Sequence, residues 1–370
     1  RLDGMGQGFA AVSVAGGKIY TTGNVNDSQS VLCIDEATQK IEWTAGLTEK
    51  NPKHGYDGSR CTPSIDGDLL FVVTSNGAIS CLKKADGSVV WQKDFRTEWG
   101  GKMMSGWGFS ESPLVDGDLV LCTPGGADAM IVALKKATGE EVWRSAEPSL
   151  GDRGKDGAGY SSIVVSNGAG VKQYVTLTGR GLIGVRASDG KFLWGYNRVA
   201  NNTANIPTPL PSGDYVFGAS GYGTGGGLVK LTAKGDGVDA EEVYFLEQKT
   251  FQNHHGGMLL HDGYIYAGHG HNNGFPICLD YMTGDVKWGG ERGPGKGSAA
   301  VTYYDGHVIF RYQSGEVALF EAIPTEKKAK GVFKPEVVND PAWAQPVVAN
   351  GKLYLRDQNT LMVYDLSAAK

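Results

Sequence analysis

The chain has 370 residues, of which 41% are hydrophobic, and its formal net charge is −5. This composition can supply a sizeable core, and an acidic balance without a basic stripe disfavours a nucleic-acid partner. No apolar run approaches the length of a membrane-spanning helix, so the sequence predicts no transmembrane segment. The 56 glycines and 14 prolines are spread along the chain, which indicates many tight turns and no disordered block.

One sequence pattern recurs from the N-terminus to the C-terminus. Each copy holds a short apolar strand, a two-residue hairpin signal, further strands and a closing aromatic residue. Two clear copies read ISCLKKADGSVVW, over residues 79–91, and IVALKKATGEEVW, over residues 131–143. The closing aromatics, in chain order, are Trp43, Trp91, Trp143, Trp194, Tyr244, Trp288 and Phe333. They recur roughly every 40 to 50 residues, which is the spacing of propeller blades.

Each repeat predicts four short antiparallel strands, because alternating apolar and polar runs are separated by hairpin signals such as Asp66-Gly67 and Asp116-Gly117. One such sheet buries both its faces only when neighbouring sheets stack on it. The chain holds eight of these hairpin units. The sequence therefore predicts an all-β fold, an eight-bladed β-propeller with four-stranded antiparallel blades, and a single domain over residues 1–370.

The last repeat predicts how the ring closes. It contains three strands, the last two near residues 352–357 and 361–366, and it lacks a closing aromatic. We expect Arg1 and Leu2 to be the end of its missing fourth strand, so that the N-terminal segment completes the C-terminal blade and removes an open sheet edge. A chain that starts inside a strand without an initiator Met also leads us to expect a longer native protein.

A second set of equivalent positions lies seven residues before each hairpin signal, where the innermost strand of each blade begins. The residues at these positions are Phe9, Ser59, Phe109, Tyr160, Asn205, His255, Ser298 and Trp343. Equivalent positions of a radial repeat lie on a circle, and the innermost strands give the smallest circle. The sequence therefore predicts that these eight residues, the inner column, form a ring at one mouth of the channel.

The five cysteines are mostly explained by the repeat. Cys33, Cys81 and Cys278 each precede the closing Trp by the same number of residues, where other repeats place a small residue, so we predict that they are buried packing residues. Cys61 and Cys122 lie outside this pattern. A disulfide between them stays open, and an odd count gives no disulfide framework.

The repeats resemble a known family. The segments CLDYMTGDVKW, over residues 278–288, and ALKKATGEEVW, over residues 133–143, are similar to the PQQ-type propeller repeat of quinoprotein dehydrogenases and of BamB-like assembly factors. The segments NHHGG at 253–257 and PAWAQP at 341–346 resemble secreted bacterial propellers of this type. The resemblance implies an exported protein, periplasmic, outer-membrane associated or extracellular. It does not imply a bound quinone, because the repeat describes blade packing.

The quinoprotein dehydrogenases that the chain resembles have adjacent cysteines over the quinone and a Glu, Asn and Asp set around calcium. In this sequence Glu111, Asn205 and Arg60 lie at or beside the inner column, but no Asp joins them and no two cysteines are neighbours. Several links between blades are short, which leaves little chain to cap a quinone. We therefore expect no cofactor, with PQQ and calcium as the alternative.

Four of the seven histidines fall in one short stretch, at His254, His255, His269 and His271. A His-X-His pair on one side of a strand is a possible half of a zinc or copper site, so His254, His269 and His271 are metal-ligand candidates. The alternative is that these histidines hydrogen-bond hairpin loops at the channel mouth. Nearby, the GYGTGG segment at 221–226 fits a nucleotide-binding motif formally, but it opens no helix and is predicted to be a hairpin loop.

Three functions follow from these residues. The first is a non-catalytic binding scaffold of the bacterial cell envelope for a protein or glycan, with exposed aromatics and arginine as contact residues. The second is a PQQ-dependent oxidoreductase. The third is a polysaccharide lyase or hydrolase in which His255, Tyr160, Arg60 and Glu111 supply base, acid and charge neutralisation. The predicted ligand- or partner-binding residues are Arg60, Phe109, Glu111, Tyr160, Asn205, His255 and Trp343, with Tyr56, Trp99 and Trp107 as further exposed aromatics. The binding scaffold is the favoured function, and the oligomeric state stays open.

Overall fold

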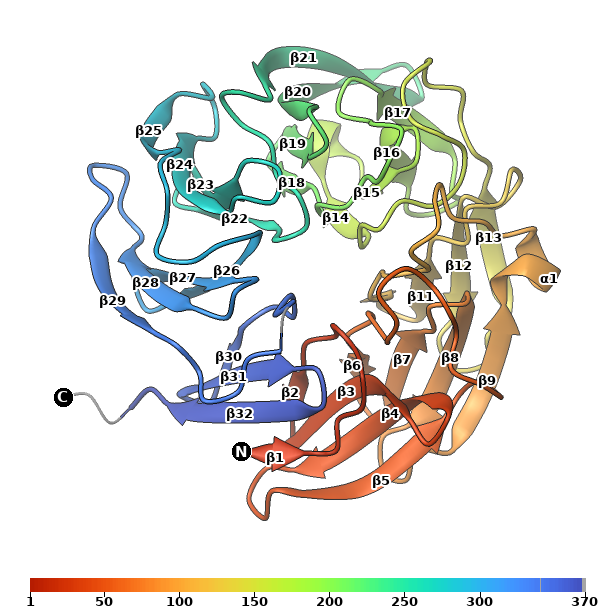
Figure 1. Ribbon diagram of the computed structural model, residues 1–370. Coiled ribbons are helices and arrows are strands. Elements are labelled where there is room, and N and C mark those ends of the chain that lie inside the picture. The colour runs from red at the N-terminus through yellow and green to blue at the C-terminus, as the bar shows by residue number, and fades with distance from the viewer. Residues whose placement is uncertain (340, 368–370) are drawn as a thin grey trace.

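The computed structural model describes residues 1–339 and 341–367. Within this part of the chain eight four-stranded antiparallel sheets surround one axis, so the predicted eight-bladed β-propeller is confirmed (Figure 1). In every blade the first strand lies innermost, and consecutive strands are hydrogen-bonded neighbours outward from the axis. No helix in the described ranges is long and apolar enough to cross a membrane.

The first four blades follow one another without interruption. Blade 1 contains β2 (Ser13–Ala15), β3 (Lys18–Val25), β4 (Ser28–Asp35) and β5 (Lys40–Gly46), and blade 2 contains β6 (Ser64–Asp66), β7 (Leu69–Val73), β8 (Ala78–Lys83) and β9 (Val89–Asp94). Blade 3 contains β10 (Leu114–Asp116), β11 (Leu119–Cys122), β12 (Ile131–Lys135) and β13 (Glu141–Ser145), and blade 4 contains β14 (Val164–Ser166), β15 (Gln173–Thr178), β16 (Gly181–Arg186) and β17 (Phe192–Tyr196). A short helix, α1 (Phe95–Trp99), follows blade 2, and a 3₁₀ turn, η1 (Gly168–Gly170), follows β14.

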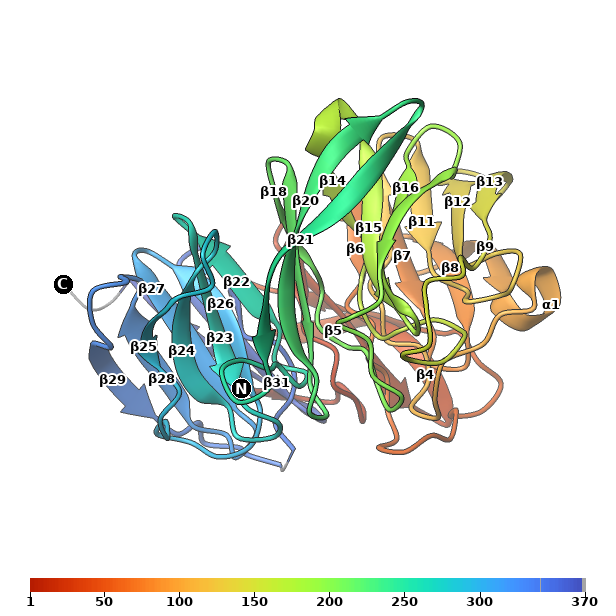
Figure 2. The same ribbon diagram turned by 90° about the horizontal axis from the view of Figure 1, so that it is seen from above.

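The second half of the ring repeats this plan. Blade 5 contains β18 (Leu210–Ser212), β19 (Tyr215–Ser220), β20 (Gly225–Lys234) and β21 (Gly237–Glu247), and blade 6 contains β22 (Met258–His261), β23 (Tyr264–His269), β24 (Phe275–Asp280) and β25 (Val286–Gly289). Blade 7 contains β26 (Ala299–Tyr304), β27 (His307–Tyr312), β28 (Val317–Glu321) and β29 (Ala329–Phe333), and blade 8 contains β30 (Val347–Ala349), β31 (Lys352–Asp357), β32 (Thr360–Asp365) and β1 (Leu2–Asp3). The long hairpin of β20 and β21 extends beyond the neighbouring blades (Figure 2).

The closing aromatics join neighbouring blades. A Cβ added to Gly87 would meet the ring of Trp43 at 2.6 Å, and one added to Gly139 would meet the ring of Trp91 at 2.7 Å. The same relation joins Gly190 to Trp143 in the preceding blade. These glycines also have positive φ, so a side chain would strain the turn as well as displace the indole. The Thr-Gly or Asp-Gly turn of one blade is therefore the packing surface for the aromatic of the blade before it.

Small residues lie directly across the sheet from each tryptophan. Cys33, Cys81 and Cys278 pair with Trp43, Trp91 and Trp288, and the strand register shifts by a bulge just after each cysteine. The prediction of buried packing cysteines is confirmed. All five cysteines are free thiols, so the pairing of Cys61 with Cys122 that the sequence left open does not form.

Hydroxyl groups tie the innermost strands together. The amide of Ala11 donates to Thr62 Oγ1 at 3.0 Å, the amide of Thr62 donates to Ser112 Oγ at 3.2 Å, and the amide of Ser112 donates to Ser162 Oγ at 3.0 Å. The last bond of this series, the hydroxyl relay, is donated by the amide of Ser162 to Thr208 Oγ1 at 3.4 Å. Because each bond joins one blade to the next, the relay fixes the spacing of blades 1 to 5 at the axis.

The ring closes between the N-terminal strand and blade 8. In β1 and β32, Leu2 pairs with Leu361 and Asp3 pairs with Thr360. The guanidinium of Arg356 is fully buried beside this closure and donates to the carbonyls of Met5 at 3.2 Å and Gly6 at 3.1 Å, to the Thr22 carbonyl and to Thr21 Oγ1 at 2.7 Å. Burial lowers the pKa of Arg356 to about 9, which still leaves it charged at neutral pH. One cation thus joins the N-terminal segment, blade 1 and blade 8.

Candidate functional site

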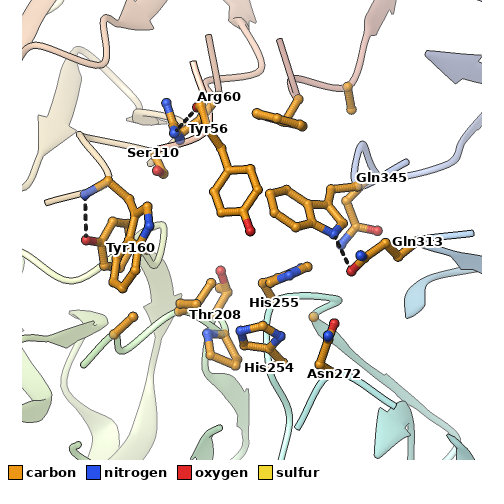
Figure 3. Close-up of a pocket in the computed structure, with 18 of the residues that line it drawn as sticks. Tyr56, Arg60, Ser110, Tyr160, Thr208, His254, His255, Asn272, Gln313 and Gln345 are labelled. Atoms are coloured by element: carbon orange, nitrogen blue, oxygen red, sulfur yellow. Dashed lines mark hydrogen bonds between the residues drawn. The ribbon is translucent and has the colours of Figure 1, made fainter. Parts of the chain in front are cut away.

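A cavity of about 540 Å³ opens at the axis of the ring, and all eight blades or their connections contribute to its lining. We call it the mouth pocket. Its aromatic lining residues are Phe9, Tyr56, Trp107, Tyr160, Tyr222, Trp343, His254, His255 and His271. Its polar residues include Arg60, Thr62, Ser110, Ser112, Thr208, Asn272, Gln313 and Gln345. Figure 3 shows these side chains converging from opposite sides of the ring. The volume lies within the roughly 300–1,000 Å³ of small-molecule sites.

The predicted inner column divides into two groups. Phe9, Tyr160, His255 and Trp343 line the mouth pocket. The other four, Ser59, Phe109, Asn205 and Ser298, are buried beside it. Only half of the inner column therefore contributes side chains to the lining of the mouth pocket. Neighbouring side chains of an extended strand point to opposite sides, so a small shift in the strand's start turns a side chain away from the axis.

The buried members of the column hold the fold together. The Asn205 side-chain amide donates to the carbonyls of Thr178 at 2.9 Å and Gly179 at 3.0 Å. Phe109 packs edge-on against Phe95 of α1, with ring centroids 5.1 Å apart. These contacts explain why Asn205 and Phe109, which we predicted to bind a ligand or partner, are buried beside the cavity and do not line it.

Trp99 is also buried, contrary to its predicted exposure. Its indole Nε1 donates to Glu141 Oε2 at 2.8 Å, and its ring packs on Phe95. The aromatic residues of the α1 region therefore belong to the packing of blades 2 and 3. Of the further exposed aromatics that the sequence suggested, Tyr56 and Trp107 do line the mouth pocket.

Arg60 lies in the mouth pocket and holds the loop that carries Tyr56. Its Nη2 donates to the carbonyls of Tyr56 at 2.6 Å and Gly55 at 2.8 Å, and its Nη1 donates to the carbonyl of Gly58 at 2.8 Å. The guanidinium also lies 5.9 Å from the ring centre of Phe9. Burial lowers the pKa of Arg60 to about 10, so it is a cation at neutral pH. Most of its donor capacity is directed at backbone carbonyls.

One wall of the pocket is built around Trp343. Its ring lies edge-on to Tyr56 with centroids 4.7 Å apart and edge-on to His255 at 4.5 Å, and Phe9 packs at 5.1 Å. The indole Nε1 donates to Gln313 Oε1 at 2.9 Å, which fixes the ring's rotation (Figure 3). Tyr56 is 57% exposed, so this wall ends in an aromatic ring open to solvent.

A second wall is built around Tyr160 and Trp107, whose ring centroids are 6.2 Å apart. The Tyr160 hydroxyl is 2.6 Å from Ser105 Oγ, and it accepts the amide of Trp107 at 3.4 Å. Burial raises the pKa of Tyr160, so the phenol is neutral at physiological pH. A Cβ on Gly55 would meet the Trp107 ring at 2.8 Å, which places the Tyr56 loop directly against this wall.

Three histidines form the third side of the pocket. The ring of His254 lies 4.1 Å from that of His255 and 4.3 Å from that of His271. His254 contacts Ser298 Oγ at 2.9 Å through Nδ1 and the Tyr222 hydroxyl at 3.1 Å through Nε2. Burial, followed by the neighbouring imidazoles, lowers the pKa of His254 to about 2. Burial likewise lowers the pKa of His255 to about 4. These two imidazoles are therefore neutral at pH 7.

The predicted metal ligands are only partly brought together. His254 and His271 meet in the mouth pocket, but His269 is turned toward Phe251, and its Nδ1 accepts the amide of Gln252 at 3.2 Å. Among the described residues no group of three or more histidine, cysteine, aspartate or glutamate side chains is arranged to hold a metal ion. Both ring nitrogens of His254 already have hydrogen-bond partners. This geometry favours the alternative that the histidines fix loops at the mouth.

Glu111 does not line the mouth pocket. It is 3% exposed, and its Oε1 accepts the amide of Thr123 at 2.6 Å, whereas Oε2 has no hydrogen-bond partner among the described residues. Burial raises the pKa of Glu111 to about 7. The carboxyl that we predicted to join His255, Tyr160 and Arg60 is thus held behind the channel wall.

The residues present do not fit the calcium and quinone arrangement that the family resemblance implies. Glu111 and Asn205 are both buried away from the cavity and bonded to backbone groups. Arg60 donates to three backbone carbonyls, and all five cysteines are separate free thiols. No Asp or Glu is among the described residues that line the mouth pocket. The donor set for a calcium ion beneath a quinone is therefore not assembled there.

Sequence reasoning missed several lining residues, above all Tyr222, Asn272 and Gln345. Tyr222 lies in the turn between β19 and β20, which confirms that the GYGTGG segment is a hairpin loop. Tyr222 and Asn272 both have a φ of 55°, and Tyr56 has a φ of 60°. A left-handed backbone is uncommon for a residue with a side chain, and such strain clusters at ligand clamps. Tyr222 and Asn272 lie in turns between the second and third strands of blades 5 and 6, and such turns differ in length from blade to blade, so periodicity could not find them.

Comparison with known proteins places the chain in a family. The model of the family described as outer membrane protein assembly factor BamB matches residues 27–290. No curated protein matches the sequence. BamB from Moraxella catarrhalis has a similar structure, with a TM-score of 0.67 and 14% identity over 98% of this chain and 95% of that chain.

Quinoprotein structures are similar to a comparable degree. A europium-containing methanol dehydrogenase has a TM-score of 0.65 and 15% identity over 95% of this chain and 83% of that chain. Quinohemoprotein alcohol dehydrogenase from Comamonas testosteroni has a TM-score of 0.64 and 13% identity over 95% of this chain and 70% of that chain. At these identities the structural likeness shows the fold alone. Because the family model covers more than half of its length, the chain belongs to the BamB family of PQQ-type propellers.

Proposed function

We propose that this protein is a non-catalytic binding propeller of the bacterial cell envelope and that the mouth pocket is its recognition site. The observation that carries the proposal is the exposed aromatic wall of Tyr56 and Trp343. The Tyr56 ring is 57% exposed, its backbone is left-handed, and its carbonyl is held by the half-buried Arg60. An exposed aromatic ring on a strained but ordered backbone is a feature of binding sites. Aromatic residues and arginine also dominate binding hot spots.

The chemistry of the lining supports binding over catalysis. The described lining holds no carboxylate, and the pKa values of His254 and His255 are far below neutrality. A general acid or base works best with a pKa near the operating pH. The cell-envelope location rests on the family, whose printed description names an outer membrane assembly factor.

The test compares wild-type protein with a Tyr56→Ala/Trp343→Ala double variant. Both proteins are immobilised and exposed to a bacterial envelope extract, and bound proteins and glycans are identified by mass spectrometry. We expect at least one saturable partner that the wild type retains and the double variant loses. Equal retention by both proteins would contradict the proposal. Thermal unfolding of both proteins, measured alongside, shows that the double variant is folded.

The second candidate is a quinoprotein-like oxidoreductase, the activity named for two proteins of similar fold, a methanol and an alcohol dehydrogenase. Wild-type protein is incubated with PQQ and calcium and assayed for dye reduction with alcohols and sugars. We expect no turnover above the protein-free control. Turnover that depends on PQQ would make the dehydrogenase the correct function and the binding scaffold wrong.

A further inference from the structure

We propose that the ligand of the mouth pocket is an uncharged saccharide, bound by aromatic contact and by hydroxyl and amide groups. This inference rests on the proposed function, because it names the chemistry of what the recognition site takes. It follows from four properties of the lining: its charge, the angles between its rings, its polar groups and its rigidity.

The charge of the pocket disfavours both a cationic and an anionic ligand. No Asp or Glu is found among the described lining residues, so no carboxylate there balances a positive charge, and Arg60 repels one. The lining contains one Arg and no Lys, and Arg60 already donates to the carbonyls of the Tyr56 loop. Lowered pKa values keep His254 and His255 neutral at pH 7. An uncharged ligand would enter such a site without leaving a buried charge unpaired.

The angles between the rings disfavour a flat aromatic ligand. Tyr56 and Trp343 are inclined to each other at 67°, and Trp107 and Tyr160 are inclined at 61°. Neither pair forms the parallel slot that would hold a planar ring between two faces. Rings at these angles present several differently directed surfaces. A puckered pyranose, whose C–H groups project from both faces, can contact more than one of them at once.

The polar groups between the aromatic walls are the third property. Thr62, Ser110, Ser112 and Thr208 bring hydroxyls to the lining, and Asn272 and Gln345 bring side-chain amides (Figure 3). Hydroxyls and amides each offer both a donor and an acceptor. The rim of a sugar is made of hydroxyls that also donate and accept, so the two surfaces are complementary. Thr62, Ser112 and Thr208 each accept an inter-blade amide, so what they offer a ligand is chiefly the donor of the hydroxyl. An aliphatic ligand would leave these hydroxyl donors without an acceptor at a cost.

The rigidity of the walls completes the argument. Gln313 fixes the Trp343 indole, Ser105 holds the Tyr160 hydroxyl, and Arg60 fixes the loop of Tyr56. Sugars bind weakly per contact because water competes for every hydroxyl. A site that is ordered before binding avoids the entropic cost of arranging its walls afterwards. This order requires left-handed backbones at Tyr56, Tyr222 and Asn272, which are conformationally unfavourable for residues with a side chain.

The experiment measures binding of defined sugars by isothermal titration calorimetry and by intrinsic tryptophan fluorescence. The probes are maltotriose, cellotriose, mannotriose and xylotriose, with trigalacturonic acid as the charged comparison. We expect at least one uncharged trisaccharide to saturate the wild-type protein and to bind more tightly than trigalacturonic acid. Affinity electrophoresis with the corresponding polysaccharide then distinguishes a glycan chain from a free sugar as the source of the ligand.

Variants connect that binding to the pocket. Trp343→Ala and Tyr56→Ala should each weaken the affinity at least about tenfold, whereas Tyr56→Phe, which keeps the ring, should stay within about threefold. Phe192→Ala is the matched control, because Phe192 is 40% exposed on β17 in the outer part of blade 4. It should bind as the wild type does. Circular dichroism and thermal unfolding confirm that each variant is folded.

Three outcomes would overturn the inference. They are the absence of saturation with every uncharged sugar, tighter binding of trigalacturonic acid, and sugar binding that survives both alanine variants. If the sugars fail while an envelope partner still depends on Tyr56 and Trp343, the saccharide is wrong and the recognition site stands. If neither sugar nor partner responds to these variants, the recognition site itself is wrong.

Discussion

The aromatic residues between the blades and those around the mouth pocket differ in origin and in environment. Trp43, Trp91 and Trp143 recur with the repeat, and each packs on the glycine of a turn in the next blade. Trp107 lies in a connection between blades, and Trp343 lies at an inner-column position whose residue type differs from blade to blade; both face a cavity. The difference indicates that aromatics conserved in type across the repeats stabilise the ring, whereas aromatics that do not recur from blade to blade are available for recognition.

The sharpest test of this comparison replaces one tryptophan of each kind. Trp194 is 3% exposed, and its Nε1 donates to Gln173 Oε1 at 2.5 Å. Trp194→Ala should lower the free energy of unfolding by on the order of 3 to 5 kcal/mol, because it leaves a large cavity between sheets. Trp343→Ala should cost only about 1 kcal/mol, since its ring already borders an open cavity. Urea denaturation followed by circular dichroism measures both, and equal losses would break the comparison.

Two arginines, Arg356 at the ring closure and Arg60 at the mouth, allow the same contrast between the fold and the site. Arg356 is fully buried at the ring closure and donates to carbonyls of the N-terminal segment and blade 1. Arg356→Met should lower the free energy of unfolding by about 3 kcal/mol, because several buried carbonyls lose their donor. Arg292→Met is the matched surface control. Hydrogen exchange should locate the loss at residues 2–8, and unchanged protection there would show that Arg356 does not hold the closure.

The buried carboxyl of Glu111 makes stability depend on pH. Its pKa is raised to about 7 from an ordinary value of 4.5. Between these values the unfolded chain releases the proton while the folded protein retains it, so stability falls as pH rises and levels off above pH 7. Relative to Glu111→Gln, which keeps an acceptor for Thr123, the wild type should lose about 2 kcal/mol between pH 4.5 and 7. Parallel pH profiles of the two proteins would contradict the raised pKa.

The fold was predictable because its determinants repeat. A glycine four residues before the closing aromatic and a small residue across from it recur at Trp91, Trp143, Trp194 and Trp288, and each has one packing role. The missing fourth strand of the last repeat similarly pointed to the N-terminus, and Leu2 does pair with Leu361. Periodicity reports what all blades share, so it identifies the core and the order of the strands.

The site was predictable only in part, because it depends on what the blades do not share. Arg60, Tyr160, His255 and Trp343 were found, since each lies at or beside the start of an inner strand. Glu111 lies between Ser110 and Ser112, which line the pocket, so its own side chain points the other way and is buried in the core. Tyr222 and Asn272 reach the cavity from hairpin turns with left-handed backbones, and no local pattern in the sequence gives the direction of a side chain in such a turn.

The smallest expected effect on stability concerns Arg60, the counterpart of Arg356 at the mouth. Arg60→Met removes the three donors to the carbonyls of Gly55, Tyr56 and Gly58 while keeping an aliphatic side chain beside Phe9. Water can reach part of this exposed loop and replace the lost bonds, so the free energy of unfolding should fall by less than about 1 kcal/mol. The loop itself should lose order, because these three bonds help to hold the left-handed backbone at Tyr56. Hydrogen exchange over residues 54–58 should therefore rise clearly while the rest of the ring keeps its protection, and any ligand or partner that depends on Tyr56 should bind several-fold more weakly.

A large loss of global stability with unchanged exchange in this loop would show that Arg60 supports the fold as Arg356 does, and that the mouth is not separately organised.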